Sequence, residues 1–593
     1  MTQDFATILD RYSNEQTDLI HILWDIQRSY GHVPADAVLA VADRLGIAPG
    51  DVMETASFYH FFHDAPSGTY RIYLSNNVIA KLRGYQQVRE ALEQATGTTF
   101  GGPGSADFGL FDTACIGLSD HEPAMLIDDV VFTDLTPASV TDIISRLKQG
   151  QSPAEIANPS GLPRSDVGYV EALTHTEVHT SGPVFFNGEI DYRALLERCL
   201  TTTPEDVITT VMDSRLHGRG GAGFPTGIKW RLCREAAGDE KYIICNADEG
   251  EPGTFKDRVL LTRAPKQVFA GMIIAAHAVG ATHGIVYLRA EYEYLREYLE
   301  RQLAELRDDR LLGDGFDIQI KMGAGAYICG EESALIESCE GKRGTPRLKP
   351  PFPVEHGFLG MPTCVNNVET FAAATRIMEL GADWFAAMGT PGSSGTRLLS
   401  VSGDCAAPGI YEIEWGVTLR EVLEIVGASN ARAVQLSGPA GEMVSADADA
   451  DRRLAHEELS CNGSFMVFNA ERDLLSVVRD FMQFFVDESC GICLPCRAGN
   501  VLLREKVDLV IDGRAKQSDL DDMVQWGGAI ASTSRCGLGA CSPSPILTTL
   551  ERFPEDYAAR LHEQEGDLLP SFDLDAALGG YGVAVRQLEQ ESR

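Results

Sequence analysis

The chain has 593 residues, and 44% of them are hydrophobic, so it is long enough to form several domains with packed cores. Acidic residues outnumber basic ones by 86 to 50, which gives a formal net charge of -36. This charge argues against a protein that binds nucleic acid or an anionic membrane nonspecifically.

The sequence also predicts a cytoplasmic protein. Its first residues lack the basic and then apolar order of a secretory signal, and its best apolar candidate for a membrane span, 268–279, is too short to cross a bilayer. The 14 cysteines are too sparse for a disulfide scaffold, and several of them are clustered. In a reducing compartment such clusters favour metal binding.

Helical patterns open the chain, and an alternating pattern follows them. Between Leu19 and Phe62 apolar residues recur at helical spacing, which predicts a small helical bundle. After Gly68, strand and helix patterns alternate, near residues 70–74, 84–95, 124–132 and 137–147. This order is typical of a small α/β domain of the thioredoxin type, and we expect this domain and the bundle to occupy residues 1–150.

Two segments in this part of the chain carry a first resemblance, Ala56-Ser57-Phe58-Tyr59 and Lys81-Leu82-Arg83-Gly84. With them, residues 15–147 resemble the small [2Fe-2S] subunit family of respiratory NADH dehydrogenases. The four cysteine ligands of that family correspond here to Ser75, Ala80, Cys115 and Ser119. One thiolate cannot hold a cluster that needs four ligands. We therefore predict a metal-free domain that braces its neighbour or docks a partner.

A predicted linker, 151–185, precedes a glycine-rich loop at 218–230. The spacing G-x-G-x-x-G, typical of dinucleotide-binding folds, is satisfied by Gly218, Gly220 and Gly223. The residues before the loop follow a helical rather than a strand pattern, and Pro225 disfavours a helix directly after it. We therefore expect the loop, with Arg219 and Lys229, to bind phosphate in another geometry; a plain surface loop is the alternative.

Strands and helices alternate beyond this loop, which predicts a Rossmann-like α/β domain over residues 186–395 with ligand loops at its strand ends. The strand patterns cover 242–245, 285–288 and 316–322, and the helical patterns cover 265–279 and 291–306. Acidic groups follow two of the strands, at 248–251 and 331–332. They are either solvated surface carboxylates or acceptors for ribose hydroxyls, and the loops 349–352 and 366–367 would complete such a pocket.

The last third of the chain contains a region of short strands and a cysteine cluster. The strands, with turns and one helix, predict a β-grasp-like module over 396–468, followed by a helical domain over 469–555 and a tail over 556–593. The helical domain contains the pattern C-x2-C-x2-C, formed by Cys490, Cys493 and Cys496. Three such thiolates can take three corners of an iron–sulfur cube, with Cys536 or Cys541 as the fourth ligand; a structural zinc site is the alternative.

Together these motifs resemble a known family. Residues 190–555 are similar to the flavin-bearing NADH-oxidising (51 kDa-type) subunit of complex I in the glycine-rich loop and in the runs 246–253, 325–332 and 488–496. The fusion to a cysteine-depleted 24 kDa-type domain resembles one branch, the diaphorase flavoprotein (alpha) subunits of soluble NAD-reducing [NiFe] hydrogenases. The beta subunit of NAD-dependent formate dehydrogenase and a complex I flavoprotein subunit are alternatives. A scaffold or NADH sensor with structural zinc is an alternative of another class, which would lack flavin.

The resemblance implies FMN and a [4Fe-4S] cluster as cofactors, with NAD(H) as the substrate. The cofactor-binding residues that it implies are Gly218, Arg219, Gly220, Gly221, Gly223, Phe224, Lys229, Asn246, Asp248, Glu249, Glu251, Tyr327, Gly330, Glu331, Glu332, Lys349, Phe352, Asn366, Asn367 and Thr370. It makes Glu332, beside flavin and nicotinamide, the candidate catalytic residue. The implied cluster ligands are Cys490, Cys493, Cys496 and Cys536, which leaves Cys541 spare. Leu232 stands where relatives often carry a second aromatic residue.

The implied function is that of an NAD-dependent oxidoreductase, the diaphorase part of a hydrogen:NAD+ oxidoreductase. Nicotinamide exchanges two electrons as hydride, whereas iron–sulfur clusters pass one electron at a time, and a flavin can do both. The resemblance also implies partners, namely an iron–sulfur electron-transfer subunit and the [NiFe] hydrogenase subunits of a soluble complex. We expect no nucleic-acid or membrane partner.

Overall fold

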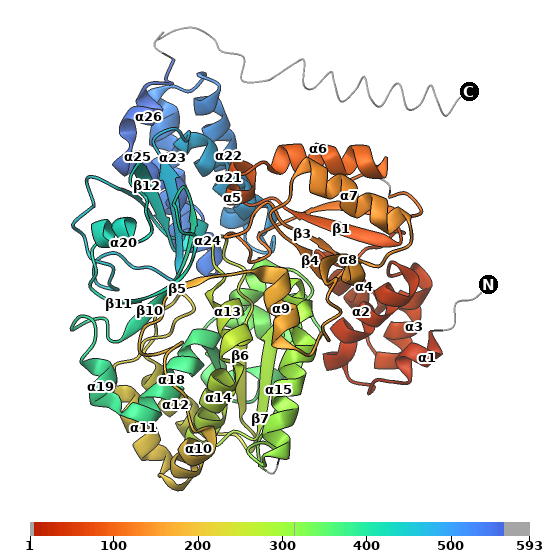
Figure 1. Cartoon of the computed structure of the whole chain (residues 1–593), viewed down its shortest axis with the longest axis vertical. Coiled ribbons are helices and arrows are strands. Elements are labelled where there is room, and N and C mark those ends of the chain that lie inside the picture. The colour runs from red at the N-terminus through yellow and green to blue at the C-terminus, as the bar shows by residue number, and fades with distance from the viewer. Residues whose placement is uncertain (1–4, 103, 314, 563–593) are drawn as a thin grey trace.

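The structure is a computed structural model that describes residues 5–102, 104–313 and 315–562, and the predicted tail 556–593 lies mostly outside these ranges. The predicted N-terminal bundle consists of α1 (Ala6–Leu9), α2 (Leu19–Tyr30), α3 (Ala35–Leu45) and α4 (Pro49–Phe58). Their apolar stripes meet in a buried core. In Figure 1 this bundle is red and lies at one side of the molecule.

The next domain contains a four-stranded sheet with the order β2-β1-β3-β4. Its central strand β1 (Tyr70–Ser75) pairs in parallel with β2 and antiparallel with β3. The other elements are β2 (Phe108–Thr113), β3 (Met125–Ile127), β4 (Val130–Phe132), α5 (Val78–Leu82), α6 (Tyr85–Thr96) and α7 (Pro137–Lys148). The predicted thioredoxin-like arrangement is confirmed, although β2 was not predicted.

The segment predicted as a linker is more regular than its turn-rich sequence indicates. It contains α8 (Pro153–Ala157), α9 (Val167–Thr174) and β5 (Val178–Thr180). The strand β5 pairs in parallel with β11 (Gly409–Glu414), which lies far along the chain. Local propensity cannot reveal such a strand, because its partner decides whether it forms.

A parallel sheet with the order β8-β7-β6-β9 forms the centre of the molecule. Its strands are β6 (Tyr242–Ala247), β7 (His283–Leu288), β8 (Asp317–Met322) and β9 (Thr363–Asn367). The inner strands β6 and β7 are almost entirely buried, as expected for a parallel sheet covered by helices. The predicted Rossmann-like α/β domain is thus present, with β9 as a strand that was not predicted.

Buried helices pack around this sheet. The helix α14 (Pro265–Val279) packs against α18 (Val368–Leu380), and both are apolar on most of their surface because neighbours surround them. The other helices of this domain are α10 (Tyr192–Thr201), α11 (Pro204–Asp213), α12 (Thr226–Glu235), α13 (Lys256–Arg263), α15 (Arg296–Asp308), α16 (Glu332–Cys339), α17 (Pro353–His356) and α19 (Ala382–Ala386). Within the described ranges no single helix is long and apolar enough to cross a membrane, although the bent pair α13 and α14 passes that test by length and composition.

The glycine-rich loop joins two helices, α11 and α12. The helix before the loop was predicted, but α12 begins at Thr226 with Pro225 as its N-cap residue. The expectation that Pro225 disfavours a helix here is therefore wrong. Proline lacks only an N–H group that the first turn leaves unpaired in any case, and its fixed φ suits a helix start.

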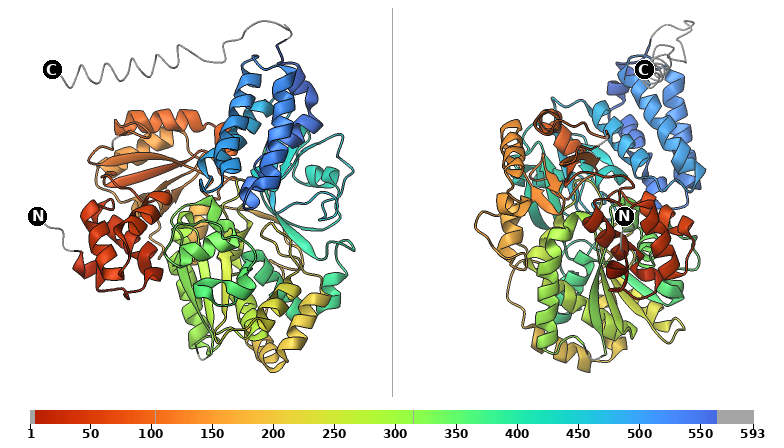
Figure 2. Two further views of the ribbon diagram at one scale, coloured as in Figure 1. Left: turned by 180° about the vertical axis from the view of Figure 1, so that it is seen from behind. Right: turned by 90° about the vertical axis from the view of Figure 1, so that its right-hand side faces the viewer.

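The C-terminal part consists of a second sheet and a helical bundle. The sheet has the order β13-β12-β14-β10-β11-β5, with β10 (Thr396–Gly403), β12 (Ala431–Leu436), β13 (Met443–Ser445) and β14 (Ser464–Asn469), and it is accompanied by α20 (Leu419–Ile425). The bundle contains α21 (Leu474–Asp487), α22 (Leu494–Ile511), α23 (Gln517–Thr533), α24 (Gly537–Cys541), α25 (Ser544–Arg552) and α26 (Pro554–Ala558). Figure 2 shows this bundle, in blue, beside the thioredoxin-like domain and above the central sheet.

Candidate functional site

The carboxyl edge of the central sheet contains a topological switch point. The chain adds β7 and β8 on one side of β6 and then returns to place β9 on the other side. At the end of this strand pair, Asn246 is in register with Asn367, and Cys245 is in register with Asn366. Ligands of open α/β sheets bind in the crevice at such a point, so the predicted site residues on these strands stand where a ligand is expected.

The glycine-rich loop lies against this edge. The backbone N–H of Arg219 donates to Thr370 Oγ1 at 2.9 Å, and a Cβ on Gly220 would lie 3.0 Å from Cβ of Asn367. Gly221 has φ +131°, and a Cβ there would meet no atom closer than Asn462 Nδ2 at 4.0 Å. The loop is thus held tightly at Gly220 and is open at Gly221, as a cradle for a phosphate or a ring system requires.

The asparagine side chains at this edge are oriented by the protein. Asn246 Nδ2 donates to the carbonyl of Gly330 at 2.8 Å. Trp230 Nε1 donates to Asn366 Oδ1 at 2.9 Å, and Asn367 Nδ2 donates to Asp257 Oδ2 at 2.6 Å. Such fixed amides present their remaining hydrogen-bonding groups in one geometry, which favours a specific ligand.

Two lysines and two glutamates form an ion-pair chain beside the loop. Lys229 Nζ lies 3.1 Å from Glu332 Oε2, and Lys349 Nζ lies 3.1 Å from Glu332 Oε1 and 2.6 Å from Glu331 Oε1. Burial favours the neutral form of Glu332, but the two lysines outweigh it and lower the pKa of the carboxyl. The structure therefore brings together four of the predicted residues, with Glu332 ionised between two cations.

The acidic turn after β6, residues 248–251, contains one carboxyl group with an oxygen unpaired among the described residues and one that is fully hydrogen-bonded. Asp248 has a buried Oδ2 atom without a hydrogen-bond partner among the described residues, and burial raises its pKa well above the ordinary value. Glu251 accepts hydrogen bonds from the Tyr327 hydroxyl and from the Ala440 N–H at 3.0 Å, and burial raises its pKa to about 7. Because this buried oxygen has no protein partner in the described ranges, Asp248 is suited to form a hydrogen bond with a ligand hydroxyl.

Two predicted aromatic residues lie at the rim. The side chains of Phe224 and Phe352 are 44% and 49% exposed, and neither ring packs on another aromatic ring in the described part of the chain. Leu232, where the resemblance implies a second aromatic residue in relatives, is 42% exposed. These side chains present apolar surface to solvent at the site, which suits contacts with a planar base.

The four predicted cluster ligands border one small, mostly apolar cavity. The residues around it include Cys490, Cys493, Cys496 and Cys536 together with Ile328, Ile492 and Leu538. Cys541 does not line this cavity. A [4Fe-4S] cluster is held by four cysteine thiolates, which is the donor set around this cavity. Four thiols around an apolar cavity fit a [4Fe-4S] cluster.

The former ligand positions of the thioredoxin-like domain do not fit a [2Fe-2S] cluster. Ser75 Oγ donates to Glu122 Oε1 at 2.6 Å, and Asn77 Nδ2 donates to the same oxygen at 2.5 Å. Cys115 Sγ lies 3.4 Å from Ser119 Oγ, and both residues are buried. A network of side chains that satisfy one another, with a single thiol, replaces the four thiolates that a cluster needs.

Sequence reasoning missed residues that reach the site from other segments. Asp257 on α13 holds Asn367, and Asn462 from the β-grasp-like module faces Gly221. Ala440 from the same module holds Glu251. Nothing in the local sequence marks these residues, because they act through contacts between distant parts of the chain.

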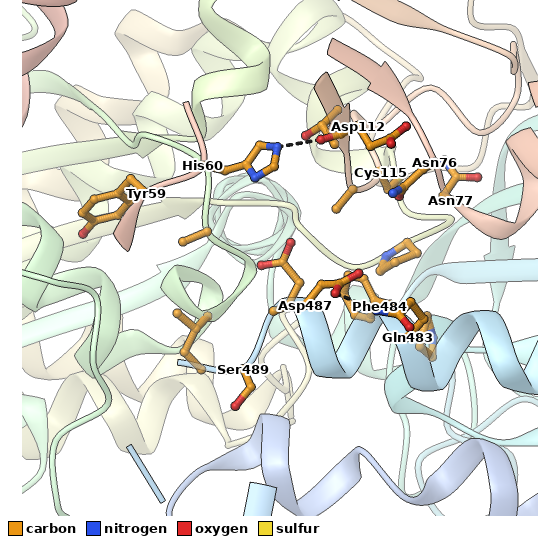
Figure 3. Close-up of a pocket in the computed structure, with 18 of the residues that line it drawn as sticks. Tyr59, His60, Asn76, Asn77, Asp112, Cys115, Gln483, Phe484, Asp487 and Ser489 are labelled. Carbon is orange, nitrogen blue, oxygen red and sulfur yellow. Dashed lines mark hydrogen bonds between the residues drawn. The ribbon is translucent and has the colours of Figure 1, made fainter. Parts of the chain in front are cut away.

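A larger cavity of about 750 Å³ lies elsewhere, between the N-terminal region, the central domain and α21. Figure 3 shows Tyr59, His60, Asp112 and Cys115 on one side of it, and the α21 residue Phe484 on the other. None of the predicted cofactor-binding residues lines this cavity. It lies next to them, because Pro252, Ala326 and Ile328 in its lining are sequence neighbours of Glu251 and Tyr327.

Three family models match the chain. Residues 211–376 match the Nuo51 FMN-binding domain, and residues 476–560 match the NADH-ubiquinone oxidoreductase-F iron-sulfur binding region. Residues 5–148 match the thioredoxin-like [2Fe-2S] ferredoxin. The first two matches cover the glycine-rich cradle and the cysteine cavity, whereas the third covers a domain that keeps the fold of its family with one of the four thiols.

Known proteins match over all or part of the chain. The chain is 67% identical over 603 residues to the NAD-reducing hydrogenase HoxS subunit alpha of Cupriavidus necator, and the match covers 100% of both chains. The NADP-reducing hydrogenase subunit HndC of Solidesulfovibrio fructosivorans is 42% identical over 398 residues, 63% of this chain and 81% of the relative. A chain of the crystal structure of NAD+-reducing [NiFe]-hydrogenase in the H2-reduced state matches with a TM-score of 0.88 and 39% identity, over 98% of this chain and 97% of that one.

Proposed function

The chain belongs to the family of the alpha subunits of NAD-reducing hydrogenases, and on that premise we propose that it is the diaphorase part of such an enzyme. In this role it binds FMN and NAD(H) at the switch point and a [4Fe-4S] cluster in the helical bundle. FMN, when bound, exchanges hydride with nicotinamide and single electrons with the cluster. The observation that carries the proposal is the open glycine cradle against Asn367 at the end of β9.

We assign the binding of FMN to the cradle and to the polar groups that face it. The glycines allow the flavin to approach the backbone, and Asn246, Asn366 and Thr370 stand at the same edge with fixed orientations. Asp248, with its unpaired buried oxygen, accepts a hydroxyl group of the cofactor. This set of groups provides donors and acceptors without a general base, which hydride transfer does not need.

We assign the binding of NAD(H) to the ion-pair chain and the exposed rings. Lys229 and Lys349 provide positive charge for phosphates, while Glu332 limits the net charge between them. Phe224 and Phe352 provide apolar surface for a base at the rim. Because Glu332 is held ionised by both lysines, it is a fixed negative charge beside the reacting groups and not a proton donor near neutral pH.

We assign the cluster to Cys490, Cys493, Cys496 and Cys536, and the partners to an iron–sulfur electron-transfer subunit and [NiFe] hydrogenase subunits. The full-length similarity favours this assembly over a formate dehydrogenase or complex I subunit, because it includes the cluster-free N-terminal domain. We further propose a cytoplasmic location, supported by cysteines that are all free in the described part of the chain.

The metal and flavin contents of the protein test this function. The chain expressed alone is expected to show flavin absorbance and about four irons, from one cube and no [2Fe-2S] cluster. The native complex is expected to contain nickel and to reduce NAD+ with H2. Molybdenum in place of nickel would move the chain to a formate dehydrogenase, and a flavin-free chain that contains zinc would make it a scaffold.

A further inference from the structure

The loop 115–120 of the thioredoxin-like domain packs against the central domain directly behind the acidic turn after β6. The carbonyl of Cys115 accepts a hydrogen bond from Arg289 Nη2 at 2.8 Å, and the carbonyl of Gly117 accepts one from Arg258 Nε at 3.0 Å. Arg258 and Arg289 are only 1% and 4% exposed. Two buried guanidinium groups of the central domain thus bind the backbone of one loop in another domain.

The same two arginines also hold Glu249 in the acidic turn. The carboxylate of Glu249 accepts the N–H groups of Asp257 at 2.8 Å and Arg258 at 3.1 Å. It also accepts the hydroxyl of Tyr292 at 2.9 Å. The carbonyl of Glu249 accepts a hydrogen bond from Arg289 Nη1. Glu249 therefore connects the N-terminal domain to the turn that carries Asp248, which we assign to FMN.

Both arginines are paired with carboxylates. This pairing holds each guanidinium group in one orientation. Arg289 forms a bidentate pair with Glu291, with Nε–Oε2 3.0 Å and Nη2–Oε1 2.6 Å. Arg258 Nη2 donates to Thr176 Oγ1 at 2.6 Å and lies 3.6 Å from Asp120 Oδ1. Paired guanidinium groups in a buried site hold a fixed geometry, whereas an unpaired one would be strongly destabilising.

The contact between the domains needs a glycine at one position. Gly117 has φ +74°, and a Cβ there would lie 2.1 Å from the hydroxyl oxygen of Tyr292. The same hydroxyl donates to Glu249. Any side chain at Gly117 therefore displaces Tyr292, and with it one of the groups that orient the acidic turn.

We infer that the loop 115–120 positions the nucleotide-binding turn 248–251 through Arg258, Arg289 and Tyr292. The inference rests on the proposed function and gives the cluster-free N-terminal domain a role in it. Arg289 and Tyr292 are positioning residues, because they act on the nucleotide site through Glu249 and not by contact with the cofactor.

Two pairs of matched variants of the full chain test the inference. Gly117→Ala displaces Tyr292, whereas Gly97→Ala, at φ +77° with no atom within 4 Å, has the same backbone strain without a clash. Tyr292→Phe removes the hydrogen bond to Glu249, whereas Tyr298→Phe removes a similar buried hydrogen bond to the carbonyl of Thr262 at 2.9 Å.

The readout is the dissociation constant for FMN, measured together with NADH-driven dye reduction and the melting temperature. We expect Gly117→Ala and Tyr292→Phe to weaken FMN binding by at least about threefold, with no such change in the two controls. A merely structural role would lower the melting temperature and leave the dissociation constant for FMN at the wild-type value.

Equal dissociation constants for FMN in each variant and its control would overturn the inference, provided that the wild-type chain binds FMN and reduces the dye. A wild-type chain without flavin or NADH-driven activity would instead overturn the proposed function. The isosteric change Tyr292→Phe keeps the test decisive if Gly117→Ala fails to fold.

Discussion

Replacement of Gly221 by valine tests the flavin cradle. Gly221 has φ +131°, a conformation that residues with a side chain rarely adopt, so the change should cost the folded state about 1–2 kcal/mol. The first added carbon meets no atom closer than 4.0 Å, so the polypeptide does not clash with it. The valine methyl groups instead enter the space assigned to FMN. We expect FMN affinity to fall at least about 100-fold, or about 2.7 kcal/mol.

The control for this change is Gly313→Val, because Gly313 has φ +119° with no atom within 4 Å and belongs to the surface loop before β8. The measurements are FMN per polypeptide, NADH-driven dye reduction, iron content and thermal unfolding. Both variants should lose similar stability and keep their iron, but only Gly221→Val should lose flavin and activity together. Normal flavin content in Gly221→Val would refute the assignment of the cradle.

Three further changes test other parts of the site. Glu332→Gln removes the negative charge between two lysines, which should stabilise the reduced flavin. The midpoint potential of the flavin should rise by about 30 mV, equivalent to about 1.4 kcal/mol, and an unchanged potential would make Glu332 a plain surface carboxylate. Cys536→Ala should lose the iron but keep the flavin, whereas Cys541→Ala should keep both; the reverse result would identify Cys541 as the ligand. Burial raises the pKa of Glu122 from 4.5 to about 8, so between these two pH values the folded state binds more protons than the unfolded state. The free energy of unfolding should therefore fall as the pH rises through this range. Glu122→Gln should remove that slope, and thermal melts that show equal slopes for both proteins would contradict the buried, protonated carboxyl.

The sequence alone determined the type of the long, strongly patterned elements and identified the motifs. The length of its apolar run was sufficient for α14, whose predicted bounds 265–279 are those in the structure, because a run of this length is too long for a strand. The cysteine triplet and the glycine-rich loop were recognisable because their residues are adjacent in sequence. Spacing alone left a plain surface loop and a structural zinc site open, and the resemblance to a known family implied FMN and a [4Fe-4S] cluster.

Local patterns failed where a distant partner decides the structure. The strand β9 was not predicted, yet its pairing with β6 brings Asn367 to the glycine-rich loop. The strand β5 lies in a segment whose turn-rich sequence predicted a linker, and its pairing with β11 joins that segment to the second sheet. In both cases the pairing strand lies far away in sequence, so no local window contains the information.

The arrangement of the site was decided by tertiary structure for the same reason. The glycine spacing predicts a phosphate loop, but the β6–β9 switch point decides which carboxylates and amides face it. Three thiols were evident from one motif, whereas the fold brings Cys536 to their cavity and leaves Cys541 outside it. The contacts that join Cys115 and Gly117 to Glu249 cross two domains. The sequence thus shows which residues can bind a cofactor. The fold decides which of them meet, because packing and not local propensity brings distant segments together.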